Sequence, residues 1–561
     1  MKKRLKILIK KAKKFHKKKK SSLDQLLLIL LVGGFVLMLG FLLFYITSFK
    51  SSNKSISSIL PADQTIAYIQ VQNTSLPSKF INDTDWRPEM LEAELQRFFG
   101  IEEKNIIKNW GQGSLGAIWL NESPAKEPIL FIHSSHKNEL LEFFKGLALP
   151  NEILNETNKG DLTIYSYPES HSFHFTFVGS YVLVSKNQSG LHHIYNTYVG
   201  EEDALLDNEA FKKSKSNLPK MDWMEGYINV KEIGLSKIGE NLQLLKPLSH
   251  IIHHTSWTVR KSSNGFQVNT FTHLTPDVLE LKKGHTDSKR FAYELTEYIS
   301  SENIIGYIGG ANLSDEWQST LETIANLNPA YAIIFEGILR GQVSKIFGSE
   351  VTLRNDLYPL FEGEYALAFS EQENGQIGTQ LLLGHNDADF TKAKMEKLAK
   401  GFKLLAAKFA PRVHTVLLPD NTESKELIAD DEKLRETTKE YEGYEINCLE
   451  VTDSPYGFCY VVMDDLVAMA NNYNAIESTV NLLTSSKHVF AQYQPFRQTL
   501  GHLSKVSDEI TFVDLEKITP YLLDNTYGNF LMPVLNKLEA TTWVKHYFND
   551  GVSVEGFLLF N

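Results

Sequence analysis

The chain has 561 residues, of which 42% are hydrophobic and 22% are charged, a composition typical of a folded protein with more than one domain core. The formal net charge is −11, yet residues 1–20 hold twelve lysines and arginines and no acidic residue, so residues 21–561 carry −23. An acidic body argues against nucleic acid as its partner, because binding to phosphates requires a cationic surface.

A basic tail over residues 1–23 is followed by an apolar run, LLLILLVGGFVLMLGFLLFYI, that contains neither a charge nor a proline. Its 21 residues would span about 30 Å as a helix, which is the thickness of the hydrocarbon core of a bilayer. We therefore predict a transmembrane helix over residues 24–48. The residues that mark this span are Leu26, Gly33, Gly34, Gly40, Tyr45 and Ile46.

A cleavable signal peptide is the alternative, but the apolar run is longer than such segments and ends in FYITSFK instead of small residues. The positive tail places the N-terminus in the cytoplasm. This orientation predicts a single-pass protein of the inner (cytoplasmic) membrane, with the bulk of the chain periplasmic or otherwise extracytoplasmic.

An internal repeat organises the rest of the chain. Residues 60–75 (LPADQTIAYIQVQNTS) align without a gap with residues 299–314 (ISSENIIGYIGGANLS), so that Tyr68 meets Tyr307. The segments that follow also recur in the same order, as strands, turns and amphipathic helices. Each copy closes with a hairpin pattern, which turns at Asn264-Gly265 in the first and at Asp550-Gly551 in the second.

These patterns predict an α+β protein with a short tether (49–57), a first repeat unit (58–275), a junction (276–294) and a second repeat unit (295–561). Hairpins and meanders outnumber single strand–helix alternations, so each unit should form a largely antiparallel, curved sheet of about nine strands. The alternating strands predict helices on one face of that sheet.

A membrane anchor followed by this repeat resembles a bacterial family catalogued as domain of unknown function 3352. The resemblance rests on Leu60, Pro61, Ala62, Asp63 and Tyr68, and implies membership over most of residues 58–561. The second unit has ISSE at 299–302 instead, so its membership depends on the repeat. The family implies no activity and no catalytic residues.

Cys448 and Cys459 are the only cysteines and flank a turn-like segment, VTDSPYG, between two strand-like runs. Outside the cytoplasm they could form a disulfide across a hairpin; the alternative is a pair of buried thiols. Their spacing, without further Cys or His nearby, does not indicate a zinc site.

Known catalytic and nucleotide-binding motifs are missing from the sequence. The run at His250, His253 and His254 could place two imidazoles on one helical face as metal ligands, but ordinary histidines are the simpler interpretation. We predict no catalytic, cofactor-binding or metal-binding residues.

The leading hypothesis is a non-enzymatic, single-pass membrane-anchored binding or scaffold protein of the bacterial envelope, with envelope proteins or a lipid as partners. The alternative is a carrier or chaperone for a hydrophobic ligand, a lipid or lipoprotein, which requires a continuous apolar cavity. An enzyme is the third and least favoured hypothesis.

Overall fold

A computed structural model describes residues 56–72, 114–121, 128–235, 251–275, 293–522 and 536–561, apart from short gaps. The predicted tail and transmembrane helix, nearly all of the tether and most of the junction lie outside the described residues. In the described part of the chain, no helix is both long enough and apolar enough to cross a membrane.

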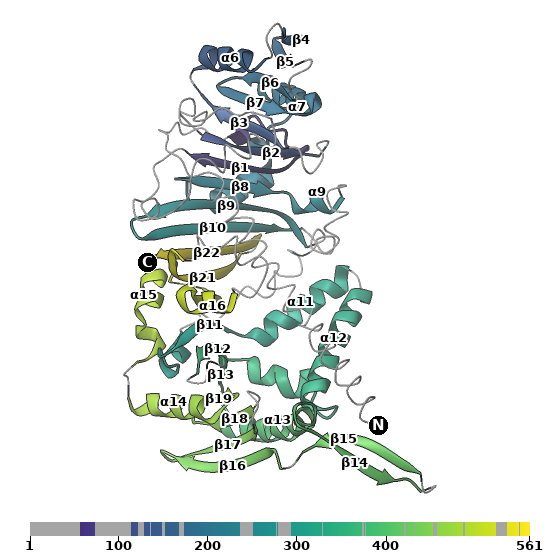
Figure 1. Ribbon diagram of the computed structural model, residues 1–561, viewed down its shortest axis with the longest axis vertical. Coiled ribbons are helices and arrows are strands. Elements are labelled where there is room, and N and C mark those ends of the chain that lie inside the picture. The colour runs from purple at the N-terminus through teal and green to yellow at the C-terminus, as the bar shows by residue number, and fades with distance from the viewer. Residues whose placement is uncertain are drawn as a thin grey trace.

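Twenty strands form one continuous sheet, and they are stacked along the long axis of an elongated body (Figure 1). All pairings in it are antiparallel, as predicted. The strands of the N-terminal half are β1 (Thr65–Gln72), β2 (Ser114–Leu120), β3 (Ile129–His133), β4 (Asn155–Lys159), β5 (Leu162–Ser166), β6 (His174–Val178), β7 (Tyr181–Ser185), β8 (Met224–Ile228), β9 (Ile252–Ser262) and β10 (Gly265–Leu274).

The strands of the C-terminal half are β11 (Ile304–Ala311), β12 (Glu364–Glu371), β13 (Ile377–Gly384), β16 (Leu434–Tyr441), β17 (Tyr444–Val451), β18 (Gly457–Val462), β19 (Leu466–Ala470), β20 (Glu509–Asp514), β21 (Leu538–Phe548) and β22 (Gly551–Phe560). Two further strands, β14 (Pro411–Leu417) and β15 (Glu423–Ala429), pair only with each other in a separate ribbon.

The two halves have the same strand order. From its outer edge inward, the N-terminal half runs β4-β5-β6-β7-β3-β2-β1-β8-β9-β10. The C-terminal half runs β16-β17-β18-β19-β13-β12-β11-β20-β21-β22. The outer strands β4 and β16 are polar and exposed, so they lack the alternation that marks a strand, and they raise the number per half above the nine that we predicted.

The halves join where β10 pairs with β22, and this pairing has two-fold pseudosymmetry. Asn269 and Glu555, each the fifth residue of its strand, lie opposite one another. At the two ends of the pair, equivalent strand-end amides donate to equivalent turn carbonyls of the other half. These bonds are Leu274 N to Asp550 O at 3.4 Å and Phe560 N to Asn264 O at 2.9 Å.

The first glycine of each strand shows the same symmetry. A Cβ on Gly265 would lie 2.0 Å from the carbonyl oxygen of Leu558, and one on Gly551 would lie 2.3 Å from that of Thr272. Leu558 and Thr272 are each the eighth residue of their strand. The junction is therefore organised like the interface of an isologous dimer within one chain.

The helices of the N-terminal half are α6 (Lys137–Gly146), α7 (Gln188–Val199), α8 (Glu209–Ser216) and α9 (Val230–Leu235). Those of the C-terminal half are α11 (Leu313–Leu327), α12 (Pro329–Phe347), α13 (Ala388–Phe409), α14 (Tyr473–Thr484), α15 (Gln494–Leu500) and α16 (Leu515–Leu522). Asparagine caps the equivalent helices α7 and α14, where Asn187 accepts from Ser189 N and Asn472 accepts from Ala475 N.

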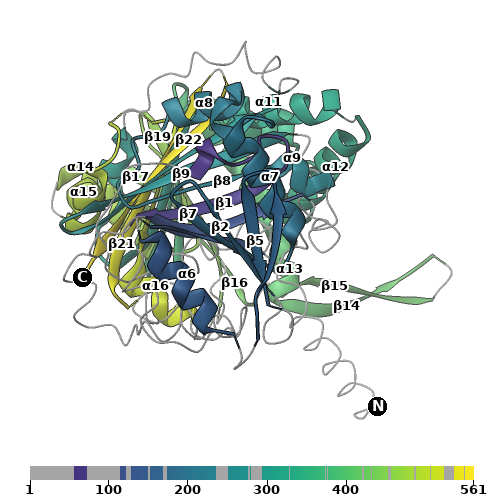
Figure 2. The same ribbon diagram turned by 90° about the horizontal axis from the view of Figure 1, so that it is seen from above.

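The prediction that helices cover only one face is wrong. On β7, Leu183 packs in the apolar cluster that contains Leu191 of α7, whereas Val184 packs in the cluster that contains Phe144 of α6. In the other half, α14 and α15 lie on the face equivalent to that of α7, and α13 covers the opposite face. All five residues of β7 are buried, so both faces of the sheet need a cover. Figure 2 shows helices on both sides of the sheet, seen along the long axis.

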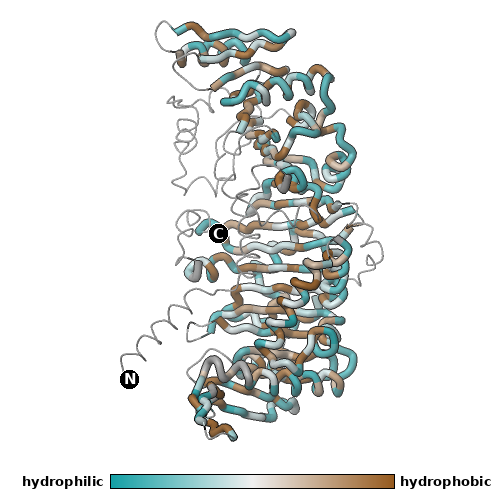
Figure 3. The backbone as a smooth tube through the Cα atoms, turned by 90° about the vertical axis from the view of Figure 1, so that its right-hand side faces the viewer, coloured by the Kyte–Doolittle hydropathy of each residue, from teal (hydrophilic) through white to brown (hydrophobic). Residues whose placement is uncertain are grey.

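We call the face covered by α7, α8, α14 and α15 the first face, and the opposite one the second face. Along the strands, hydrophobic and hydrophilic residues alternate (Figure 3). Tyr68 and Tyr307, which the repeat aligns, both lie on the first face and are fully buried. The segments at 60–63 and 299–302 have the same role in each half, since Pro61 bridges to Ala204 and Ser300 bridges to Val489.

Candidate functional site

The first face of β8, β9 and β10 carries buried polar side chains between the two apolar cores of the sheet. We call this set the polar cluster: Glu225, His254, Ser256, Thr258, Asn269 and His273. Five of its members are buried, and His273 is half-buried. Burying polar groups lowers stability unless each finds a hydrogen-bond partner.

The C-terminal half has apolar residues at four of the six equivalent positions, whereas Thr542 and Glu555 stand in place of Ser256 and Asn269. Given the matching registers, the replacements are Ile510 for Glu225, Ala540 for His254, Val544 for Thr258 and Leu559 for His273. All four belong to the apolar core of that half. The strand topology therefore does not require polar residues at these four positions, and Glu225, His254, Thr258 and His273 are specific to the N-terminal half.

Three imidazoles meet at one end of this cluster. The Nδ1 atoms of His253 and His254 lie 3.0 Å apart, and the rings of His254 and His273 are 5.2 Å apart between centroids. Burial, followed by the neighbouring His253 and His273, lowers the pKa of His254 from 6.5 to about 3. Burial also lowers the pKa of His273. These rings are consequently neutral near pH 7.

Glu225 lies at the other end, where it forms an ion pair with Lys215 of α8 and accepts a hydrogen bond from the Tyr68 hydroxyl at 3.2 Å. Beside it, three buried polar atoms have no hydrogen-bond partner in the described structure. They are Ser256 Oγ, Thr258 Oγ1 and Asn269 Nδ2. Such atoms are the usual partners of ordered internal water.

Ser214 Oγ of α8 lies 2.5 Å from His254 Nε2, an arrangement that resembles a nucleophile beside its general base. Ser214 is 0% exposed and His254 is 1% exposed, so no substrate reaches the pair. A pKa of about 3 also makes His254 a poor base at neutral pH. The contact therefore ties α8 to β9 and does not build an active site.

The metal alternative for His250, His253 and His254 assumed a helix, and that secondary structure is wrong. His253 and His254 lie in strand β9 and not in a helix, because that segment pairs with both β8 and β10; His250 lies outside the described residues. Among the described residues, the one set of three ligand atoms within 4.8 Å of each other belongs to Cys448, Glu450 and Cys459. A disulfide occupies both sulfurs of that set.

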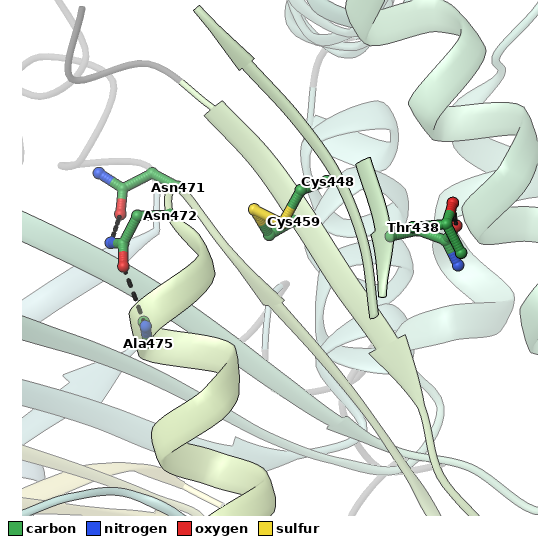
Figure 4. Close-up of a disulfide and its surroundings, with 7 residues drawn as sticks. Thr438, Cys448, Cys459, Asn471, Asn472 and Ala475 are labelled. Atoms are coloured by element: carbon green, nitrogen blue, oxygen red, sulfur yellow. Dashed lines mark hydrogen bonds between the residues drawn. A yellow bond between two sulfur atoms is a disulfide. The ribbon is translucent and has the colours of Figure 1, made fainter. Parts of the chain in front are cut away.

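Cys448 and Cys459 are direct partners in the hairpin β17–β18, and their sulfurs are 2.09 Å apart (Figure 4). Both lie in the apolar core of the C-terminal half. The predicted transmembrane residues Leu26, Gly33, Gly34, Gly40, Tyr45 and Ile46 all lie outside the described residues.

A pocket of about 260 Å³ lies next to the disulfide, between α13 and strands β16–β18. Its rim is charged, with Lys400, Lys403, Glu396 and Glu436, and Lys403 Nζ lies 2.5 Å from Glu436. Lipid-binding sites are larger and mostly apolar. This pocket therefore does not favour the carrier hypothesis.

The clearest surface feature is a concentration of exposed apolar side chains on the C-terminal half. Of the 15 large hydrophobic residues exposed in the described structure, eight lie on α12 and on the β14–β15 ribbon, which we call the arm. The arm projects from the body beside α13 (Figures 1 and 2). The eight residues are Ile333, Ile334, Ile338, Ile346, Val413, Leu417, Leu418 and Leu427.

Sequence reasoning missed this surface. The segment of α12 is apolar on every side, PAYAIIFEGILRGQVSKIF, and is interrupted by only three charges. Helices that are apolar on every side are normally buried. The apolar composition of this segment was therefore the signal available in the sequence, but it does not show that α12 is exposed. The arm mixes charged and apolar residues without a clear period, and it has no counterpart among the described residues of the N-terminal half.

Among solved structures, the chain is similar to several crystal forms of TP0453. Form III is 11% identical and has a TM-score of 0.23, over 43% of this chain and 90% of that one. Form I is 13% identical and has a TM-score of 0.24, over 43% of this chain and 88% of that one. Likeness at this level supports no argument about function. No curated protein matches the chain.

A family model described as "Protein of unknown function (DUF3352)" matches residues 108–404, which is more than half of the chain. The match confirms the family suggested by the sequence, but its extent is narrower than we predicted. It begins after the Leu60–Tyr68 segment on which the resemblance rested, and it crosses from one half of the sheet to the other. The chain belongs to this family of unknown function, DUF3352.

Proposed function

We propose that this chain is a single-pass, membrane-anchored protein of the bacterial envelope whose extracytoplasmic body binds other proteins and does not catalyse a reaction. The observation that carries the proposal is the exposed apolar surface on α12 and the arm. Groups of exposed apolar residues on a folded protein mark interaction sites, because burying them against a partner is favourable. Here the exposed apolar residues lie on α12, which packs against α11 and α13, and on the arm, which packs against α13.

The interior of the described structure supports a binding role over an enzymatic one. The Ser214–His254 pair, which most resembles catalytic machinery, is sealed from solvent, and burial lowers the pKa of its imidazole far below neutrality. Asp356, whose pKa is also shifted, serves a structural ion pair with Lys394 and Lys397. Although burial opposes it, hydrogen bonds from Lys397, Thr352 and Lys394 lower the pKa of Asp356 to about 2.

Two features support an extracytoplasmic body. The sequence places a basic tail before an uncharged 21-residue apolar run. The Cys448–Cys459 disulfide is of the kind that persists in oxidising compartments such as the periplasm.

Protease protection tests the membrane orientation. Protease added to spheroplasts should digest the region from residue 56 onward, and protease added to inverted membrane vesicles should leave it intact. Digestion only in the inverted vesicles would contradict the proposed orientation.

Affinity purification from native membranes, followed by mass spectrometry of proteins and lipids, tests the binding role. A partner protein should be recovered with the wild type and lost with Leu427→Glu, which places a charge at a residue that is 70% exposed on the arm. The matched control is Ile153→Glu, at a residue that is 83% exposed in the N-terminal half. Equal loss in both variants, or recovery of a stoichiometric lipid alone, would overturn the proposal.

A further inference from the structure

We propose that the arm binds helix α12 of a second copy of this chain, so that two copies exchange arms in a two-fold dimer. This inference rests on the proposed function and names the partner of the same surface. It uses two exposed apolar surfaces of one chain, α12 and the arm, which both belong to the C-terminal half (Figure 1).

One face of the arm carries three exposed apolar residues that no described part of the chain covers. Val413 and Leu427 are direct cross-strand partners, and they are 63% and 70% exposed. Leu417 lies two pleats further along the same face and is 68% exposed. An isolated two-stranded ribbon is only marginally stable in water, so packing against another surface would stabilise the arm.

Helix α12 offers a surface of matching chemistry. Ile334 and Ile338 lie one turn apart and are 57% and 50% exposed. Beside them run Gly337 and Gly341, where an added Cβ would meet no atom within 4 Å. The ridge of isoleucines next to this open row of glycines gives a surface into which the branched side chains of the arm can pack.

Charges on both surfaces favour a protein partner over the hydrocarbon of a bilayer. Lys425 and Glu423 share the apolar face of the arm, since Lys425 pairs with Thr415 and Glu423 with Leu417. Charged groups are costly inside a bilayer. On the side of α12, Arg340 and Arg354 have side chains that are 59% and 69% exposed, and both pair with Glu336. These charges can pair with those of the arm across an interface.

A second copy fits better than an unrelated protein because it supplies both surfaces at once. If the arm of one copy reaches α12 of the other, the same contact forms twice about a two-fold axis. Each copy then covers both of its exposed surfaces in a single closed assembly.

Thiol cross-linking in native membranes tests the dimer with the full chain. Two differently tagged copies are expressed together, one with Leu417→Cys and the other with Ile334→Cys, and are treated with a short bis-maleimide. The native cysteines are already joined as a disulfide, so they should not react. A cross-linked species that carries both tags is expected. Leu417→Cys paired with Ile153→Cys is the control and should not cross-link.

Three outcomes would overturn the dimer. They are no cross-link above the control, a cross-link between Leu417→Cys and a different protein, and labelling of the arm by a bilayer-restricted photoprobe. The second outcome would leave the proposed binding function standing. A body located in the cytoplasm by protease protection would refute the proposed function, whatever the cross-linking result.

Discussion

The two halves of the sheet share one topology but differ in the chemistry of the first face. Next to the junction, the N-terminal half has Glu225, Thr258 and His273, where the C-terminal half has Ile510, Val544 and Leu559. Both sets are accommodated by the same strand order. The comparison teaches that the strand arrangement tolerates either polar or apolar side chains at these positions.

The aligned tyrosines show the same contrast at one position. The hydroxyl of Tyr68 donates to Glu225, whereas the hydroxyl of Tyr307 is buried and has no hydrogen-bond partner in the described structure. The C-terminal half differs in a second way, since the disulfide, α12 and the arm all belong to it. The polar cluster and the exposed apolar residues of α12 and the arm thus lie in different halves.

The largest expected effect comes from breaking the junction that relates the halves. Gly265→Val and Gly551→Val should each lower the free energy of unfolding by about 3 kcal/mol or more, because each Cβ would collide with a backbone carbonyl of the facing strand. Urea unfolding of the detergent-solubilised chain measures this change. The control is Gly146→Ala, where an added Cβ meets no atom within 4 Å. A small effect in only one of the two valine variants would disprove the symmetry of the junction.

Removing the disulfide tests whether the C-terminal half, which contains it, loses more stability than the N-terminal half. In the double variant Cys448→Ala/Cys459→Ala, no disulfide restricts the unfolded chain, so the unfolded state gains conformational entropy. The free energy of unfolding should therefore fall by about 2 to 3 kcal/mol. Pulsed proteolysis with mapping of the fragments should show the earliest new cleavage sites in the C-terminal half. Equal loss of protection in both halves would mean that the halves do not differ in this respect.

The histidines of the polar cluster predict a pH dependence that the apolar C-terminal counterpart lacks. The pKa of His254 in the folded protein is about 3, below its unfolded value of 6.5, so the unfolded chain binds more protons between these values. Stability should therefore be complete above pH 6.5 and fall as the pH drops, by about 2 kcal/mol at pH 5. Urea unfolding of His254→Gln should show a shallower loss; an identical pH profile would contradict the account.

The smallest expected change in stability is at the arm. Leu417→Lys should alter the free energy of unfolding by no more than about 0.5 kcal/mol, since Leu417 is 68% exposed and the described part of the chain does not cover it. The same substitution should abolish recovery of the partner in affinity purification. A large loss of stability would indicate that the arm packs within its own chain.

Much of the fold could be predicted from the sequence, because its strands and hairpin turns have clear local sequence patterns. The aligned strands around Tyr68 and Tyr307 and the closing hairpins at Asn264 and Asp550 all correspond to strands and turns of the sheet. The pairing of β10 with β22 could not be predicted, since it joins residues that are almost 300 positions apart in the chain. Helices on the second face were missed because one sequence cannot show which faces of a strand are covered.

The candidate site was harder to predict than the fold. The spacing of His250 and His254 is compatible with one face of a helix, but pairing with β8 and β10 places His253 and His254 in a strand. The polar cluster depends on comparing positions such as Glu225 and Ile510, and that comparison needs the strand registers of both halves. Exposure of Ile334 on α12 likewise depends on the packing of α11 and α13 and not on its own segment.

Hydrogen exchange of the detergent-solubilised chain tests most directly the claim that the two halves form one continuous sheet. The account predicts that backbone amides of β10 and β22 near Asn269 and Glu555 exchange as slowly as those of the interior strands β1 and β11. Exchange of β10 and β22 as fast as that of the exposed edge strand β4 would contradict it, and would mean that the halves are separate bodies.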